Sequence, residues 1–550
     1  MSGNRGLRLG TIALAVVPVV FLGAFFLLPL SGMLARGFWV DGSLDLGGLT
    51  ETLARPRVHR VLWFTVWSSS VATVVTVLFG VPVAYALYRL EFPTRRLLRA
   101  LVVMPFVLPT VVVGVAFRTL LAPAGPLGFL GLDGTAVAIL AALVFFNLAV
   151  VVRTVGGLWE GMDHRREDAA AALGASPWQV FTTVTLPALR PGIVSAATVV
   201  FLFCSTAFGV VLTLGGLRYG TVETEIYILT TQFLDLRAAA VLSVVQLVAV
   251  VLLLTLAGRT RGTRVHAVER AGSRRLGRRP GRGDAPALAV TAVVVAFLAA
   301  PILTLVARSL QDGGGWGLGN YRALGTTGDG TALLVPGWTA LENSLRTAVD
   351  ATWLALLLGL TVAFLVSRPT RTRGERRARS LLDGLFMLPL GVSAVTIGFG
   401  FLITLDRPPL DLRSSPVLVP IAQAMVALPL VVRTLVPVLS SIDPRQRQAA
   451  AALGASPMRA LLVVDLPAVW RPALAAAGLA FAVSLGEFGA TSFLARSDRP
   501  TLPVVIYQLI SRPGPENFGM ALAASVVLAV VTVTVMGAVE RLRVGSMGTL

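Results

Sequence analysis

Lysine is absent from this 550-residue sequence, and cysteine and histidine are scarce. A Walker A loop needs a lysine to reach the phosphates of ATP, so the chain cannot hydrolyse ATP through a P-loop of its own. The single cysteine, Cys204, excludes an intramolecular disulfide and a cysteine-based metal cluster, and its apolar surroundings predict a packed thiol. The three histidines, His59, His164 and His266, are too far apart in the sequence to suggest a metal site. We therefore expect neither a metal nor another cofactor.

Charged residues of both signs are also few. They make up 14% of the chain, against about 25% in a typical soluble domain, while 55% of the residues are hydrophobic. Apolar runs of about 20 residues, the length that a helix needs to cross a bilayer, recur throughout the chain. A transmembrane β-barrel would instead show alternating segments of about ten residues. The composition predicts an all-α polytopic membrane protein embedded in the lipid bilayer.

Arginine supplies the positive charge, and the formal net charge is +19. In a soluble protein this balance would favour nucleic-acid binding. Here the arginines gather in short segments between the apolar runs, as they do in the cytoplasmic loops of membrane proteins. We therefore expect no nucleic-acid partner, cytoplasmic loops at 89–100 and 368–380, and both chain termini in the cytoplasm.

About twelve predicted spans divide into two sets of six. The first repeat covers 1–257 and the second covers 286–550. The segment 258–285 between them is rich in Arg, Gly and Pro, and we interpret it as a flexible cytoplasmic linker. Because each set holds an even number of spans, the repeats have the same orientation in the membrane. The spans are predicted near 10–34, 61–88, 101–121, 135–156, 193–214, 237–257, 286–308, 341–367, 381–405, 416–440, 474–495 and 517–538.

One polar stretch occurs twice between these spans. It covers 163–191 and again 443–472, and nine residues, 169–177, are identical to 449–457. The two halves of the chain otherwise differ widely in sequence. The identity of these two loops therefore indicates two equivalent docking sites for a soluble partner. The alternative, a pair of loop helices that only close off the bundle, gives no reason for this identity.

The residues of the second copy predict two short helices. Asp-Pro at 443–444 suits a helix start, with a carboxylate at the N-cap and proline in the first turn. Gly454 suits the C′ position that ends this helix. Ser-Pro at 456–457 starts a second helix by the same reasoning, and we expect Leu-Pro at 466–467 to break it. The corresponding parts of the first copy are Asp163, Gly174, Ser-Pro at 176–177 and Leu-Pro at 186–187.

Both copies resemble the EAA signature of binding-protein-dependent ABC importer permeases, EAA-x3-G-x9-I-x-L-P. The departures are valine for isoleucine, and Asp168 and Gln448 for the glutamate. Asp168 keeps the charge and Gln448 does not, so a salt bridge from this position to a partner is expected in the first copy alone. The matching residues are Asp168, Ala169, Ala170, Gly174, Val184, Leu186 and Pro187, and then Gln448, Ala449, Ala450, Gly454, Val464, Leu466 and Pro467.

The resemblance implies the type I importer fold and a transport subunit without bond-breaking chemistry, in the bacterial inner membrane. In this family the two loops form coupling helices that sit in grooves of two copies of a cytoplasmic ATPase subunit. A solute-binding protein delivers the solute on the external side. The fused, double-length chain resembles the thiamine and iron(III) permeases.

Ionisable residues inside spans are candidates for the solute pathway, because charge in the bilayer core is costly. Glu487 lies in such a run, and the paired position of the first half offers Ser205 and Thr206. An equally weighted interpretation places Glu487 at a helix break, with its carboxylate bonded by backbone N–H groups.

The solute is less well specified by the sequence. The segment 484–491, SLGEFGAT, resembles molybdate and sulfate permeases, which are single-length chains, whereas 212–240 and 499–510 resemble thiamine permeases. Glu223 and Glu225 would favour a cationic solute at the external mouth, unless they are ordinary solvated loop carboxylates. We expect thiamine, with iron(III) as the alternative. A secondary transporter driven by an ion gradient is the alternative from another class, and Glu487 alone gives it little support.

Overall fold

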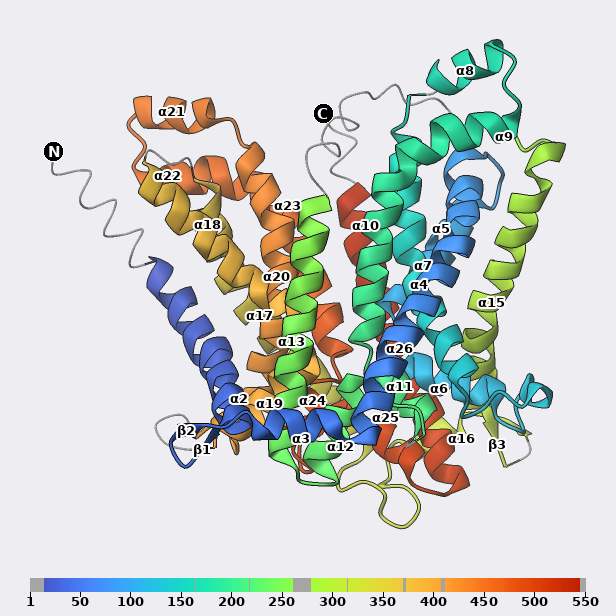
Figure 1. The fold of residues 1–550 in the computed structure, drawn as a ribbon, viewed down its shortest axis with the longest axis vertical. Coiled ribbons are helices and arrows are strands. Elements are labelled where there is room, and N and C mark those ends of the chain that lie inside the picture. The colour runs from blue at the N-terminus through green and yellow to red at the C-terminus, as the bar shows by residue number, and fades with distance from the viewer. Residues whose placement is uncertain are drawn as a thin grey trace. The chain divides into compact units, whose positions relative to one another are not determined.

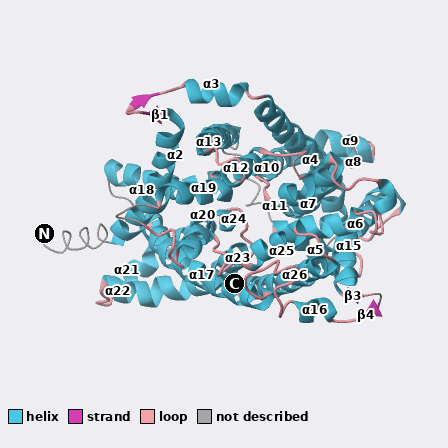
Figure 2. Cartoon of the chain, turned by 90° about the horizontal axis from the view of Figure 1, so that it is seen from below, coloured by secondary structure: helices cyan, strands magenta, loops and turns pink. Residues whose placement is uncertain are grey.

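Nearly every element of the computed structural model is a helix, as Figure 2 shows. The structure describes residues 14–163, 165–216, 218–260, 278–313, 315–368, 372–406 and 411–544. Within these ranges the strands form two antiparallel two-residue pairs, β1 with β2 and β3 with β4. The prediction of an all-α polytopic membrane protein is confirmed. The strands are β1 (Trp39–Val40), β2 (Ser43–Leu44), β3 (Gln311–Asp312) and β4 (Gly315–Trp316).

The described part of the first half forms a series of long apolar helices joined by short ones. In chain order these are η1 (Gly23–Leu27), α2 (Leu28–Phe38), α3 (Gly47–Ala54), α4 (Pro56–Arg89), α5 (Arg95–Val107), α6 (Thr110–Leu121), η2 (Gly128–Leu130), α7 (Ala136–Glu160), α8 (Arg165–Ala172), α9 (Pro177–Val180), η3 (Phe181–Thr185), α10 (Leu186–Ser205), α11 (Gly209–Gly215), α12 (Val222–Thr231) and α13 (Leu236–Thr260).

The second half repeats most of this order. Its described helices are η4 (Arg282–Asp284), α15 (Ala285–Ser309), α16 (Gly319–Ala323), α17 (Gly337–Ser367), α18 (Arg373–Met387), η5 (Leu388–Gly391), α19 (Ala394–Thr404), α20 (Leu418–Ser441), α21 (Pro444–Ala452), α22 (Pro457–Ala460), η6 (Leu461–Asp465), α23 (Leu466–Leu485), α24 (Thr491–Leu494), α25 (Leu502–Ser511) and α26 (Pro515–Val544).

The chain forms two compact units that do not follow chain order. Unit 1 comprises 1–49, 226–244 and 318–550, and unit 2 comprises 50–225 and 245–317. In unit 1, α2 from the start of the chain packs against α19 of the second repeat. In unit 2, α15 from the start of the second repeat packs against α4, α5 and α6. The first span of each repeat is thus part of the unit built mainly from the other repeat.

Ten described helices are long and apolar enough to cross a membrane, and a bent pair raises the number to eleven. The pair is α5 and α6, which meet at 106° where the span 101–121 was predicted. The N-cap of α6 is Pro109, which has no N–H group for a continuous helical ladder. The predicted span 381–405 is likewise divided into α18, η5 and α19, and α19 has only 11 residues. The described residues therefore hold ten or eleven candidate spans, against about twelve predicted.

The span that follows each polar loop begins earlier than predicted. Helical structure extends over Pro177–Ser205 and Met458–Leu485, whereas the sequence predicted spans near 193–214 and 474–495. Both helices include the polar loop's last turns, which hydropathy alone assigns to the loop.

Each unit contains the same close crossing of two spans. In unit 2, a Cβ at Gly80 of α4 would lie 2.7 Å from Val151 Cγ1 of α7. In unit 1, a Cβ at Gly359 of α17 would lie 2.6 Å from Val431 Cγ1 of α20. A side chain does not fit at either glycine without displacing the valine, so both crossings depend on the missing Cβ. This shared contact supports the assignment of two repeats.

The predicted linker and termini are only partly described. Residues 258–260 end α13, whereas 1–13, 261–277 and 545–550 lie outside the described residues, as do His164 and His266. The end of the linker is attached to unit 2, because the amide of Arg278 donates to the carbonyl of Arg89 at 3.1 Å and the amide of Glu91 donates to the carbonyl of Arg278 at 2.9 Å. Residues 278–285 are therefore part of the folded unit.

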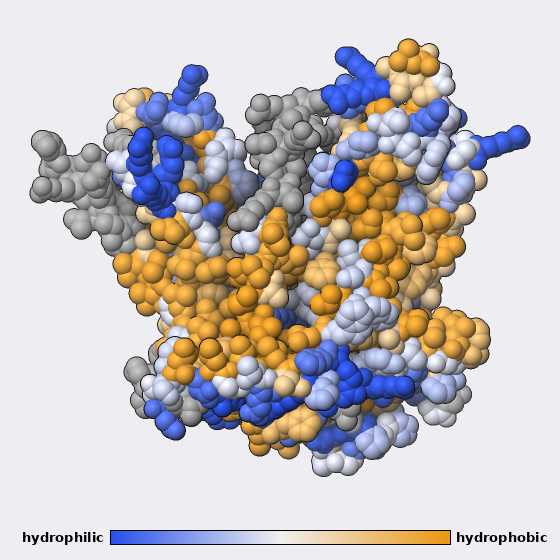
Figure 3. Space-filling view, in the orientation of Figure 1, coloured by the Kyte–Doolittle hydropathy of each residue, from blue (hydrophilic) through white to orange (hydrophobic). Residues whose placement is uncertain are grey.

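The surface of unit 1 separates hydrophobic from hydrophilic side chains. On the face drawn in Figure 3, hydrophobic side chains cover the middle of its helices, and hydrophilic ones gather around α18, α21 and α22 at one end. This is the distribution expected of helices whose middle is surrounded by lipid and whose ends lie in water.

Candidate functional site

The repeated polar stretches, called here the first loop (163–191) and the second loop (443–472), have the same local fold. In the first loop α8 and α9 lie at one end of α10, and in the second loop α21 and α22 lie at one end of α23 (Figure 1). The two short helices predicted for each loop are present.

A glycine ends the first helix of each loop. Gly174 has φ +87° and Gly454 has φ +81°, a left-handed conformation that glycine adopts readily. The amide of Gly174 donates to Ala171 at 3.0 Å, and the amide of Ala175 donates to Ala170 at 3.1 Å. The second loop repeats both bonds. This Schellman motif satisfies the last carbonyl groups of the helix and fixes the direction of the chain towards the second helix.

Side-chain caps begin the helices at the predicted positions. Asp443 accepts a hydrogen bond from the amide of Arg445 at 2.9 Å. Ser176 and Gln179 form a capping box, in which the amide of Ser176 donates to Gln179 Oε1 at 2.8 Å. These caps hold the loop conformation through local bonds, as the Asp-Pro and Ser-Pro pairs indicated.

Large apolar side chains project from both loops at matching positions. Leu173 and Leu453, next to the two glycines, are each 90% exposed. Trp178 and Met458, 280 positions apart, are 71% and 67% exposed. Isolated exposed apolar residues need no explanation, but a repeated group at the tip of two polar loops is typical of a protein-binding surface. The sequence analysis did not single out these four side chains, although the identical offset was visible in it.

Most of the predicted signature residues are exposed. A Cβ at Gly174 or Gly454 would meet nothing within 4 Å, so the space beside each glycine is open. Ala170 and Ala450 are partly buried. The exposed members are Asp168, Ala169, Gly174, Leu186 and Pro187 in the first loop, and Gln448, Ala449, Gly454, Leu466 and Pro467 in the second.

The prediction that Leu-Pro breaks the second helix of each loop is wrong. The chain passes from α9 into α10 through the π-helical segment η3, and from α22 into α23 through the π-helical segment η6. Pro187 and Pro467 then occupy the first turn of α10 and α23, where the absence of an N–H group is tolerated. The second loop helix is therefore continuous with the span that follows it.

Glu487 is buried and bonded by the backbone. Its carboxylate accepts hydrogen bonds from the amides of Ala490 at 2.7 Å and Thr491 at 3.0 Å, and its side chain stands at the break between α23 and α24. Of the two interpretations offered by the sequence, this geometry matches the helix-break interpretation. The paired hydroxyls, Ser205 and Thr206, both donate to the carbonyl of Leu202 at 2.9 Å.

Glu223 and Glu225 are not solvated loop carboxylates. Both belong to α12 and are buried. Glu225 accepts from Arg57 Nε at 2.6 Å, and Glu223 accepts from the side-chain amide of Gln246. Arg57 lies 168 residues from Glu225 in the sequence, so the sequence could not reveal that Glu225 is paired with an arginine. Gln246, on the helix that follows α12, gives Glu223 a neutral hydrogen-bond donor.

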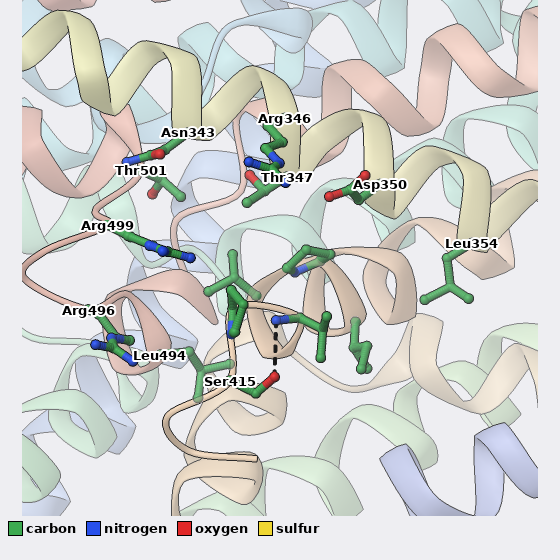
Figure 4. Close-up of a pocket in the computed structure, with 15 residues that line it drawn as sticks. Asn343, Arg346, Thr347, Asp350, Leu354, Ser415, Leu494, Arg496, Arg499 and Thr501 are labelled. Carbon is green, nitrogen blue, oxygen red and sulfur yellow. Dashed lines mark hydrogen bonds between the residues drawn. The ribbon is translucent and has the colours of Figure 1, made fainter.

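A cavity of about 350 Å³ in unit 1 has a basic lining. Arg346 and Asp350 of α17 face Arg496 and Arg499 across it (Figure 4). Arg496 bonds both carboxylate oxygens of Asp498, at 2.9 and 3.1 Å, and this bond lowers the pKa of Asp498. None of the predicted pathway residues lines this cavity, and an excess of arginine does not suit a cationic solute.

The repeated loops, the long apolar helices and the shared helix crossing describe a two-repeat membrane protein with the same polar loop in each repeat. The family model of the binding-protein-dependent transport system inner membrane component matches residues 76–261 and again 355–543. The chain belongs to this family. It is therefore a multi-pass transport subunit, and the resemblance of its loops to permeases of this class is confirmed.

Similar proteins include double-length permeases. The thiamine transport system permease protein of Brucella abortus (strain 2308) is 28% identical, over 97% of this chain and 94% of the relative. That of Escherichia coli (strain K12) is 28% identical, over 92% and 90%. The sulfate transport system permease protein of E. coli (strain K12) is 32% identical, over 46% of this chain and 93% of its own. A single-length permease thus corresponds to about half of this chain, whereas the family model matches it twice.

Proposed function

We propose that the chain is the transmembrane subunit of an ATP-driven thiamine importer, in which two copies of a cytoplasmic ATPase bind the two loops. The matching exposed side chains of the loops support this proposal most directly. Leu173 and Leu453 provide apolar contacts, while the small alanines beside them allow close approach of a partner surface.

Movement of the ATPase subunits on ATP binding pulls on the loops, and the continuous helices α9–η3–α10 and α22–η6–α23 carry this movement into the membrane. A solute-binding protein supplies thiamine from the external side. The N- and C-termini and the loops lie in the cytoplasm. Asp168 is exposed and can form a salt bridge with one ATPase copy, whereas Gln448 offers the other copy only a neutral amide.

Thiamine is favoured over iron(III) by the relatives and by the groups that a solute can meet. Ferric iron prefers oxygen ligands such as carboxylates, but Glu225 is already paired with Arg57. Thiamine carries a cationic aromatic ring, which an aromatic face can attract. The matching tyrosines Tyr227 of α12 and Tyr507 of α25 are half-buried, and their rings lie 5.4 Å from Phe493 and 5.6 Å from Phe488, respectively.

Uptake into proteoliposomes tests this function. The permease is reconstituted with its ATPase and binding protein, and labelled thiamine and iron(III) are compared with and without ATP. We expect ATP-dependent thiamine uptake that persists after an ionophore dissipates ion gradients. Uptake of iron alone would refute the solute. Uptake that needs a gradient and not ATP would instead support a secondary transporter.

A further inference from the structure

A buried polar link joins the first loop to the end of a long span in unit 2. Arg89 is the last residue of α4, and its guanidinium forms an ion pair with Glu167 of α8. Thr185 of η3 donates its hydroxyl to Glu167 Oε1 at 2.7 Å. The side chain of Glu167 is 13% exposed and that of Arg89 is 20% exposed. One carboxylate therefore holds together the coupling helix, the π-helical segment and the end of α4.

Unit 1 has a link of the same kind, made from different residues. Asp465 of η6 is buried, and its Oδ2 accepts from Arg368 at 2.9 Å. The guanidinium of Arg447, on α21, lies 2.7 Å from Asp465 Oδ1. Arg368 is the C-cap residue of α17. Here too one carboxylate joins the coupling helix, the π-helical segment and the end of a long span.

The two links occupy matching positions, but the carboxylate is contributed by a different position in each. Glu167 corresponds to Arg447 and Thr185 to Asp465, both at the 280-residue offset of the repeated stretch. The carboxylate is on the coupling helix in unit 2 and on the π-helical segment in unit 1. The arginine at the end of the long span has the same role in both units. An exchange that keeps the contact while changing its residues indicates that the contact itself is required.

We propose that this carboxylate–arginine link positions each coupling helix on α4 or α17, so that movement of the loop also moves the long span. Without it, α8 and α21 would be connected to the membrane helices mainly through the chain at their two ends. Because the charged groups are largely shielded from water, loss of one partner leaves the others uncompensated, and the link is broken rather than weakened. The role in transport rests on the proposed function, whereas the link itself does not.

Charge exchange in unit 1 tests the inference on the full chain. Arg447→Glu places a second carboxylate beside Asp465, and Asp465→Thr leaves Arg447 facing Arg368. We expect each single variant to lower ATP-driven thiamine uptake by about tenfold or more. The double variant, Arg447→Glu with Asp465→Thr, recreates the unit 2 link and should return uptake to within about threefold of the original. Arg376→Glu, an exposed charge reversal on α18, is the matched control.

A second readout does not need the ATPase. In a Cys204→Ala background, a spin label on Leu453→Cys reports the mobility of the second loop in nanodiscs. The label should become more mobile in both single variants and regain its original mobility in the double variant. Unchanged mobility in the single variants, or a double variant no better than the single ones, overturns the link. Altered mobility with normal uptake overturns its role in transport. If the original chain binds no ATPase, the proposed function fails while the label still tests the link.

Discussion

The exposed leucines at the tips of the loops allow the loss of ATPase binding in a variant to be calculated. Leu453 is 90% exposed, so its truncation to alanine removes almost no packing inside the permease. When an ATPase covers this side chain, three carbon atoms beyond Cβ leave water. At about 0.8 kcal/mol for each buried carbon, they contribute about 2.4 kcal/mol to docking. Since about 1.4 kcal/mol corresponds to a factor of ten, Leu453→Ala should weaken ATPase binding by about 50-fold.

The assay is a titration of the purified ATPase against the permease in nanodiscs, together with thermal unfolding of each permease variant. Leu334→Ala is the matched control, because Leu334 is 73% exposed and lies outside both loops, between the predicted spans 286–308 and 341–367. We expect the melting temperature to be unchanged in both variants and the affinity to fall only for Leu453→Ala. Leu173→Ala should give a loss of similar size.

The result that refutes this reasoning is equally definite. If Leu453→Ala and Leu173→Ala, singly and combined, bind the ATPase within about twofold of the original chain, the apolar tips are not docking contacts. A lower melting temperature in the permease alone would instead mean that Leu453 packs within its own chain. Only weaker binding with unchanged unfolding supports the proposal.

Two further changes test the packing of the units. Gly359→Leu should destabilise unit 1 by about 1–3 kcal/mol, because the new side chain overlaps Val431. Gly384→Leu, in open space on α18, should not. Thermal unfolding compares the two variants, and equal melting temperatures would contradict the close crossing. Glu225→Gln should lower the melting temperature because it removes the carboxylate that pairs with Arg57, and Arg57→Gln with Glu225→Gln should recover part of that loss. No recovery in the double variant would argue against the pair.

Features set by local chemistry were predictable from the sequence. The Asp-Pro and Ser-Pro helix starts and the left-handed glycines of the loops require only neighbouring residues, and both loops have the predicted helices. Span boundaries were less predictable, because hydropathy does not show that a helix can continue through Pro187 or Pro467. A π-helical turn places each proline in a first turn, where its missing N–H group does no harm.

The roles of the acidic residues depended on long-range contacts and were predicted less well. For Glu487 the sequence offered both a pathway role and a helix-break role, because its partners, the amides of Ala490 and Thr491, are close in the sequence. Glu225 could not, since its partner Arg57 is 168 residues away. The general expectation that buried charges are paired would have suggested a partner only after its burial was known.

The residue at a position in one repeat predicts the matching residue of the other repeat at some positions and not at others. Where a position is defined by backbone geometry, as at Gly174 and Gly454, the residue is the same in both. Where a position contributes charge to a shared contact, as at Glu167 and Arg447, the residue differs although the contact remains. A search for identical residues therefore finds the loops but misses the link beneath them. What the two contacts share is one carboxylate beside the arginine at the end of the long span, although the contact in unit 1 contains a second arginine, Arg447.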